Sequence, residues 1–467
     1  MANQGVLEGG AVEELRGSAR GAVTGPGDEG YEAARAVWNG MVDARPAAVL
    51  RCTGAADVMA GMRFAAARGL PLAIRGGGHN VAGFGTCRDG VVLDLGGMPG
   101  VRVDPHARLA VVQGGARWGQ VDHDTQAFGL ATTGGLVSTT GVAGLTLGGG
   151  IGWLMREHGL TCDNLVGADV VTAAGELVRA GEDPELLWAL RGGGGNFGVV
   201  TNFEFRLHPV GPVVTGGAVF HPLDRAREVL SFYEGWAQDA PDQLTTLLVF
   251  MTAPPAPFIP PEHQGRKMVA VAACHTGEPG RAAADLKPLK ERIPPVVDLM
   301  GPIPYAHLQA MFDESAPPGL RSYWKTEYLS GLGEGVVDAL VAAAEAMPAG
   351  HPAIHVHQLG GAVARGPRDS ACFGHRDAPF AANLVGVWEQ AAQDASHVAW
   401  VRAAAEGLRP FARGGEYLNF SVEGGEEKVR AAFGEEGYQR LRRVKARYDP
   451  DNVFRINQNI RPAAGGG

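Results

Sequence analysis

Two short segments contain the residue types with the clearest chemical use. One is Arg75-Gly76-Gly77-Gly78-His79-Asn80, and the other is Gly159-Leu160-Thr161-Cys162-Asp163-Asn164. Three consecutive glycines let a backbone press against a flat, anionic ligand, because no Cβ stands in the way. Histidine and cysteine side chains are both nucleophiles. His79 and Cys162 are therefore candidates for covalent bonds to a ligand held by these loops.

These segments resemble those of the berberine-bridge-like FAD oxidases of the vanillyl-alcohol-oxidase superfamily, and the resemblance covers nearly the whole chain. It implies FAD attached bicovalently, with His79 bonded to the flavin 8α-methyl carbon and Cys162 to C6. His79 must be neutral for this reaction, and a histidine with the ordinary pKa of about 6.5 is largely neutral in the cytoplasm. Cys162 needs thiolate character, which an ordinary thiol has only in small part at neutral pH.

The other glycine clusters are expected to contact the same cofactor. In the resembling enzymes, backbone N–H groups from several loops bind the FAD pyrophosphate. Besides His79 and Cys162, the predicted cofactor-binding residues are Arg75, Gly76, Gly77, Gly78, Asn80, Gly115, Thr139, Thr140, Gly141, Gly144, Gly149, Gly150, Gly152, Asn164, Gly198, Val199, Val200, Asn419 and Asn457.

One glycine cluster has a rival interpretation. Gly193, Gly195 and Gly198 match G-x-G-x-x-G, the dinucleotide fingerprint of NAD-linked dehydrogenases. That fingerprint needs a strand before it and a helix after it. Here residues 186–190 have helical spacing and residues 199–205 follow as a strand. This inverted context disfavours an NAD site.

Tyr417 is the candidate for the catalytic base. It stands in Glu416-Tyr417-Leu418-Asn419-Phe420, which matches the Y-x-N motif of the resembling family. In a strand, Tyr417 and Asn419 would share a face and both point at the flavin. The resemblance implies that Tyr417 removes the substrate proton. Its pKa would have to fall from about 10 for this role.

A second strand, Tyr323 to Leu329, is expected to form the wall above the flavin. Alternation puts Tyr323 and Lys325 on one face and Trp324 on the other. We expect the face with Lys325 to meet the flavin, which makes Lys325 and Tyr323 further catalytic candidates. A solvated strand edge is an equally good interpretation.

His355 and His357 would also share one strand face. Two histidines at this spacing are compatible with a metal site, a substrate pocket or ordinary sheet positions. Nothing nearby completes a carboxylate or thiolate shell, so no metal is predicted.

Composition excludes several classes of protein. The 467-residue chain has a formal charge of −9 and no basic stripe, which argues against a nucleic acid or an anionic membrane as partner. Five cysteines without regular spacing do not form a disulfide framework. Neither a signal sequence nor a long apolar run is present, so the expected location is the cytoplasm.

The order of the predicted elements indicates an α+β fold. The resemblance implies a PCMH-type FAD-binding domain built from residues 1–211 and completed by residues 411–467. Residues 212–410 would form an inserted substrate domain, an antiparallel sheet covered by helices.

The expected activity is that of an FAD-dependent oxidase. It would oxidise an alcohol or C–H group of a secondary metabolite or sugar by hydride transfer to flavin N5, with Tyr417 as base and O₂ as acceptor. Leu165 is bulky where plant relatives use a small residue to admit O₂. A dehydrogenase with another acceptor is therefore an alternative, and so is a flavin-dependent cyclase without net redox chemistry.

Overall fold

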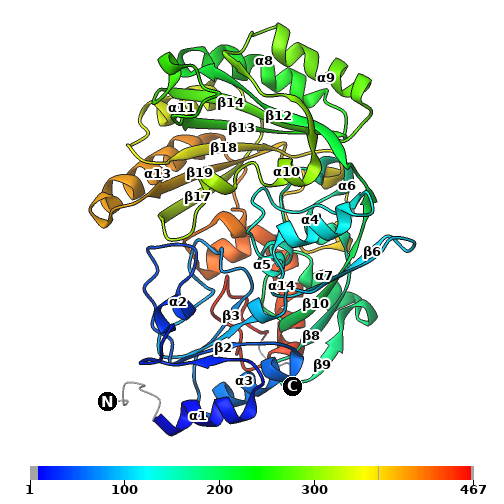
Figure 1. The fold of residues 1–467 in the computed structure, drawn as a ribbon, viewed down its shortest axis with the longest axis vertical. Coiled ribbons are helices and arrows are strands. Elements are labelled where there is room, and N and C mark those ends of the chain that lie inside the picture. Colours follow the sequence, from blue (N-terminus) through cyan, green and yellow to red (C-terminus); the bar gives the residue numbers. More distant parts are fainter. Residues whose placement is uncertain (1–8, 367, 464–467) are drawn as a thin grey trace.

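The computed structural model describes residues 9–366 and 368–463. Three large β-sheets form its frame, together with a short pair made by β7 (Leu130–Ala131) and β11 (His208–Pro209). In Figure 1 the largest sheet and its helices lie above the two smaller sheets. The predicted α+β class is confirmed.

The first sheet positions the glycine loop. Its order is β1-β2-β4-β3, and β2, β4 and β3 run parallel. Helix α3 connects β2 to β3, and its buried Val58, Met62 and Ala65 share one helix face that packs on the sheet. Strand β3 ends at Arg75, so the loop that follows starts at the sheet edge. The bounds are β1 Val23–Thr24, β2 Ala48–Arg51, α3 Ala55–Ala67, β3 Leu72–Arg75 and β4 Val91–Asp94.

The second sheet is antiparallel, with the order β5-β6-β10-β8-β9. A hairpin joins β8 and β9, and in its turn Thr172 N donates to the Glu176 carbonyl at 2.9 Å. Helix α14, which bends at Gly434, returns from the C-terminal part of the chain and buries Tyr438 and Leu441 beside α7. The bounds are β5 Val101–Asp104, β6 Leu109–Gln113, α4 Trp118–Gln126, β8 Leu165–Val171, β9 Leu177–Arg179, α7 Pro184–Leu190, β10 Val199–Arg206 and α14 Glu426–Tyr448.

The third sheet has the order β15-β12-β14-β13-β18-β19-β17, and β16 also pairs with β12. Its pairings are all antiparallel. Helices cover one face, and all nine residues of β19 are buried because both of its faces are covered. The bounds are β12 Val213–Pro222, α8 Ala226–Gln238, β13 Leu244–Thr252, β14 Lys267–His275, α9 Pro279–Glu291, β15 Val297–Asp298, β16 Gly301–Pro304, β17 Arg321–Leu329, α11 Glu334–Glu345, β18 Ala353–Gln358, β19 Phe380–Trp388 and α13 Asp394–Leu408.

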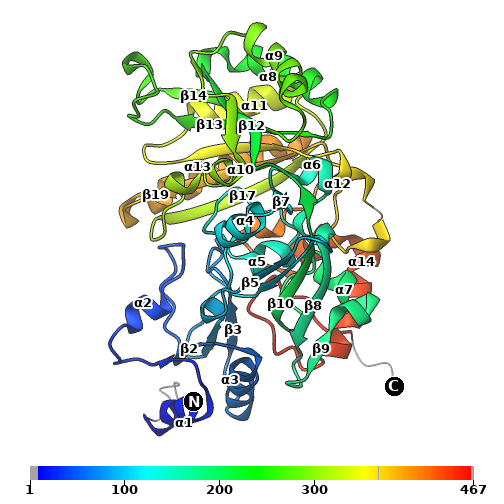
Figure 2. The ribbon, with the colours of Figure 1, turned by 45° about the vertical axis from the view of Figure 1, so that its right-hand side comes forward.

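Short helices fill the space where the large sheet meets the smaller ones. There α4 packs against α10, as the turned view in Figure 2 shows. The domain boundaries at residues 211 and 410 stay a prediction. Among the described residues, no helix combines the length and apolarity needed to cross a bilayer. The remaining helix bounds are α1 Gly9–Ser18, α2 Tyr31–Arg35, α5 Val142–Leu147, α6 Met155–His158, α10 Tyr305–Gln309 and α12 Ala362–Arg365.

The sequence pattern predicts strands over residues 416–420 and over residues 354–362, and the structure corrects both. Residues 416–420 form no strand, because Tyr417 precedes a single 3₁₀ turn at Leu418–Phe420. Strand β18 ends at Gln358, and Ala362 already begins α12.

Candidate active site

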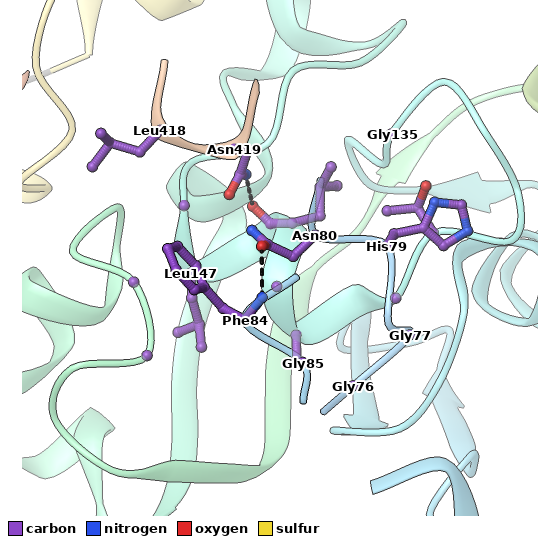
Figure 3. A pocket seen from close by; sticks show the side chains of 18 of the residues that line it. Gly76, Gly77, His79, Asn80, Phe84, Gly85, Gly135, Leu147, Leu418 and Asn419 are labelled. Carbon is purple, nitrogen blue, oxygen red and sulfur yellow. Dashed lines mark hydrogen bonds between the residues drawn. The ribbon is translucent and has the colours of Figure 1, made fainter. Parts of the chain in front are cut away.

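A cavity of about 350 Å³ lies between the three sheets. Its lining comes from the loop after β3, the loops flanking α5, the glycines before β10, the C-terminal segment, and strands β13, β17, β18 and β19 of the large sheet. Figure 3 shows the part of the wall formed by the loop after β3, α5 and residues 418 and 419.

The glycine loop packs closely against the loop before α5. A Cβ on Gly77 would overlap the backbone of Gly141, and a Cβ on Gly141 would overlap the backbone of Gly77. Gly78 has a φ of +72°, in the left-handed region where glycine is favoured. Among the described residues, nothing accepts a hydrogen bond from the backbone N–H groups of residues 77–80. Four successive free N–H groups make a cradle for an anion such as a phosphate.

His79 continues this loop and lines the cavity (Figure 3). Its Nε2 lies 3.0 Å from Thr139 Oγ1, and its ring stacks on Trp38 with a centroid distance of 5.4 Å. Burial, helped by the charge of Arg117, lowers the His79 pKa to about 4. The imidazole is therefore neutral at pH 7 and keeps one nitrogen lone pair.

The C-terminal segment forms another part of the cavity wall. Asn457 and Gln458 line it, and the Asn457 Oδ1 and both amide atoms of Gln458 have no protein partner. The buried Lys445 ammonium fixes this segment through bonds of 2.8 Å to the Asn196 and Phe454 carbonyls and 2.7 Å to Asp449. Unpartnered buried polar atoms on a rigid wall indicate a polar ligand.

The structure places Cys162, the predicted second attachment residue, away from the cavity wall. This side chain is fully buried in a core cluster with Leu160 and Tyr328 and does not line the cavity. Its Sγ faces Asp163 Oδ1 at 3.8 Å. Burial, and then the Asp163 charge, raise the thiol pKa well above its usual value. The raised pKa favours the protonated thiol over the thiolate, and the sulfur does not face the cavity.

Tyr417, the expected base, has its hydroxyl group surrounded by hydrogen-bond donors. Its hydroxyl oxygen accepts hydrogen bonds from Gly150 N at 2.9 Å and Asn419 Nδ2 at 3.0 Å. Burial outweighs these donors and raises the pKa to about 12. The Tyr417 ring lies behind Phe420, edge-on at a centroid distance of 4.7 Å, and does not line the main cavity.

Tyr323 and Lys325 lie on the face of β17 that points away from the cavity. Both side chains bind Glu423, Tyr323 through its hydroxyl and Lys325 at 3.0 Å. Arg402 of helix α13 lies over the Tyr323 ring at 5.4 Å. Trp324, on the other face, lines the cavity. The alternation was predicted correctly, but the face chosen for the wall was wrong.

The remaining predicted cofactor residues divide into two groups. One group does not line the cavity: it consists of Thr139, whose hydroxyl contacts His79, and of Gly115, Gly149, Gly150, Gly152 and Asn164. Gly115 packs on the Leu95 carbonyl, and Asn164 bonds the His158 and Leu160 carbonyls. Those that do line the cavity are Arg75, Gly76, Gly77, Gly78, Asn80, Thr140, Gly141, Gly144, Gly198, Val199, Val200, Asn419 and Asn457.

The wall of the large sheet was largely missed from the sequence. His355 and His357 line the cavity from β18, Asn383 from β19 and Trp324 from β17. Strand alternation marks these four positions as one face, but only the sheet order reveals that this face meets the cavity. In the described part of the chain, no three His, Cys, Asp or Glu side chains are grouped to hold a metal.

The glycines at 193, 195 and 198 sit in the inverted context expected from the sequence. Helix α7 precedes them and strand β10 follows. Gly193, Gly195 and Gly198 line the cavity, near Asn457. They contribute to the same ligand site as the loop of residues 76–80.

Comparisons with known proteins agree with this geometry. An FAD binding domain model matches residues 46–181, and a berberine and berberine-like model matches residues 416–461. An FAD-linked oxidoreductase of Dictyostelium discoideum is 31% identical over 97% of both chains. The (R)-6-hydroxynicotine oxidase of Paenarthrobacter nicotinovorans is 30% identical over 95% of this chain and 97% of its own.

A solved structure extends the likeness to three dimensions. The crystal structure of 6-hydroxy-D-nicotine oxidase from Arthrobacter nicotinovorans superposes with a TM-score of 0.87 at 29% identity, over 96% of this chain and 99% of that one. The cradle of free N–H groups and the unpartnered amides suit the pyrophosphate and the polar edges of FAD. The chain therefore belongs to the berberine-bridge-like family of FAD-linked oxidoreductases.

Proposed function

We propose that the protein is an FAD-dependent oxidase in which FAD is attached by one covalent bond, to His79. The observation that carries this proposal is the state of His79. Its ring is neutral, held by Thr139 and Trp38, and lies on the cavity wall directly after the glycine loop. A fixed neutral imidazole is prepared to act as a nucleophile.

A single attachment follows from the cysteines. All five lie within the described residues, all are buried, and none lines the cavity. Burial raises the thiol pKa of Cys87, the cysteine closest to His79 in the sequence, to about 11. No sulfur is thus available for a second bond to the ring.

The residues of this chain would hold the cofactor and shield the reaction. When bound, FAD removes a hydride from a substrate carbon and passes the electrons to an acceptor. The N–H groups of residues 77–80 would bind the pyrophosphate, and the unpartnered amides of Asn457 and Gln458 would bind other polar groups of the cofactor. Strands β17, β18 and β19 would cover the reacting face and exclude water.

Tyr417 is better described as a positioning residue. Its oxygen accepts from Gly150 N and from the Asn419 amide, and Asn419 also donates to the Leu145 carbonyl at 3.1 Å (Figure 3). Because Asn419 lines the cavity, Tyr417 fixes a cofactor contact without touching the substrate.

O₂ is the proposed acceptor. Leu165, the residue that suggested hindered access of O₂, is fully buried in the core of the second sheet beside Leu186 and does not line the cavity. From this position the Leu165 side chain does not narrow the path of O₂ to the flavin ring. The proposed substrate is an alcohol or C–H donor, a metabolite or sugar.

Anaerobic reduction followed by air tests the oxidase assignment. The purified yellow protein is bleached by light with a sacrificial donor and then mixed with oxygenated buffer. Return of the colour within seconds, with one hydrogen peroxide per flavin, is expected. Slow return, with rapid return on adding a dye, would instead support a dehydrogenase. No change in the redox state with any substrate would favour a cyclase.

A further inference from the structure

The wall above the cavity carries a row of polar side chains on an otherwise apolar sheet face. His355 of β18 is the direct cross-strand partner of Asn383 in β19, and Asn383 is the partner of Thr326 in β17. Directly opposed side chains on one face have Cβ atoms about 5 Å apart. His357 follows two residues after His355 and therefore points to the same face.

Several polar atoms of this row lack a protein partner. Asn383 Oδ1, Thr326 Oγ1 and His357 Nε2 have no hydrogen bond within the described residues. Buried polar groups are nearly always satisfied, and each unsatisfied one costs about 1 to 3 kcal/mol. Asn383, His355 and His357 line the cavity. Polar groups retained without partners on a cavity wall indicate that a ligand completes them.

The site offers no charge to a ligand. Arg75 is the one Lys, Arg, Asp or Glu among the described lining residues, and its guanidinium is held by the Ala34 carbonyl and by Asp94. Burial lowers the pKa of His355 to about 4 and that of His357 to about 3, so both rings are neutral at pH 7. Neither an ammonium nor a carboxylate finds an opposite charge here.

Aromatic rings frame the polar row. Phe312 lies 6.1 Å from the His355 ring, and Phe420 lies 5.5 Å from the His357 ring. Trp324 packs edge-on against Phe420 at 6.0 Å. Such a frame accommodates a flat ring by offset or edge contacts, while neutral imidazole and amide groups can each donate and accept one hydrogen bond.

We propose that His355 and Asn383, with His357 beside them, bind the hydroxyl group of an uncharged, ring-containing alcohol and discriminate against ammonium and carboxylate analogues. This inference rests on the proposed oxidase function and names its substrate class. It assigns specificity to the strand face opposite to that of Lys325.

The test uses benzyl alcohol, benzylamine and benzoate as probes of equal ring size. The protein as purified, with ring-¹⁵N-labelled histidine, is titrated with each probe at pH 7.5, and the His355 and His357 ring signals are followed by NMR. Benzyl alcohol is expected to bind at least about tenfold more tightly than either ion, the value of roughly one hydrogen bond. Equal affinity for the three probes, or no binding of the alcohol, would overturn the proposal.

Substitutions at Asn383 and His355 test whether these two residues bind the alcohol. Asn383→Leu and His355→Leu are each expected to weaken benzyl alcohol binding about tenfold, and His355→Asn should restore part of it. His351→Leu is the matched control, because this histidine is 60% exposed and lies outside the cavity. If Asn383→Leu and His355→Leu bind the alcohol as well as the control does, the assignment is wrong.

The flavin content of each sample is read separately, from its visible spectrum and intact mass. A protein with covalent flavin but without the alcohol preference contradicts only this inference. A protein without flavin contradicts the proposed function, whatever it binds.

Discussion

Thr139 Oγ1 lies 3.0 Å from Nε2 of His79, and this contact joins the loop after β3 to the loop before α5. It holds the imidazole against Trp38 and selects which nitrogen keeps its lone pair. We therefore expect Thr139→Val to slow covalent flavin attachment about tenfold, as the loss of one hydrogen bond implies. The measurement is the fraction of colour that precipitates with acid-denatured protein over time. Thr139→Ser should attach flavin at the normal rate, and an unchanged rate in Thr139→Val would contradict this role.

Tyr417→Phe distinguishes a positioning residue from a base. Removal of a general base lowers kcat by about 10² to 10⁴. We instead expect kcat to fall by less than about tenfold, because Tyr417 does not line the cavity. The variant should lose about 1 to 3 kcal/mol of unfolding free energy, since Gly150 N and the Asn419 amide lose an acceptor. A large fall in kcat with unchanged stability would show that Tyr417 is the base after all.

The buried pair of Lys445 and Asp449 is expected to hold the C-terminal wall. Both side chains are fully buried, so Lys445→Met leaves the Asp449 carboxylate in the interior without an opposite charge, with only the backbone N–H groups of Val453 and Phe454 donating to it. This should reduce the unfolding free energy by about 3 to 5 kcal/mol, measured by urea denaturation. Arg447→Met on the same helix is the control. Its ion pair with Asp183 is solvent-exposed on the arginine side, and its loss should cost about 1 kcal/mol or less.

Stability should depend on pH through buried neutral histidines, and His221 gives the clearest case. It is fully buried, and neither ring nitrogen has a partner in the described structure. Burial, followed by the charge of Arg225, lowers its pKa to about 4. Below an unfolded pKa of about 6.5, the unfolded chain takes up a proton that the folded protein does not. Unfolding free energy therefore falls as the pH drops from about 6.5 to 4, and is unaffected by this group above pH 6.5.

His221→Leu removes that contribution. Between pH 7 and pH 5 the variant should lose about 2 kcal/mol less unfolding free energy than the wild type, measured by urea denaturation at both pH values. His123→Leu serves as the control, because this side chain is 86% exposed, and it should follow the wild type. An identical pH dependence in His221→Leu would show that the pKa of His221 is the same in the folded and unfolded protein.

The sequence predicted the parts of the site that depend on local backbone chemistry. The loop of residues 75–80 could be recognised because three glycines before a histidine have few other uses. The strand over residues 323–329 was located by its pattern, and its two-residue alternation was correct.

The errors arose where tertiary packing decides the outcome. Cys162 was assigned from its sequence context, but whether a sulfur is exposed to a cavity depends on which loops fold over it. The choice between the Lys325 and Trp324 faces of β17 required knowledge of where Glu423 and helix α13 lie. Tyr417 and Asn419 come together as expected, but through a 3₁₀ turn instead of strand alternation.

Intact-mass spectrometry under denaturing conditions tests the central claim most directly. The wild type and Cys162→Ala should both weigh one FAD more than the polypeptide, while His79→Ala should show the bare polypeptide mass. After tryptic digestion, the flavin should remain on the peptide that contains His79 and be absent from the one that contains Cys162. Flavin on the Cys162 peptide, or an adduct that survives in His79→Ala, would contradict the account.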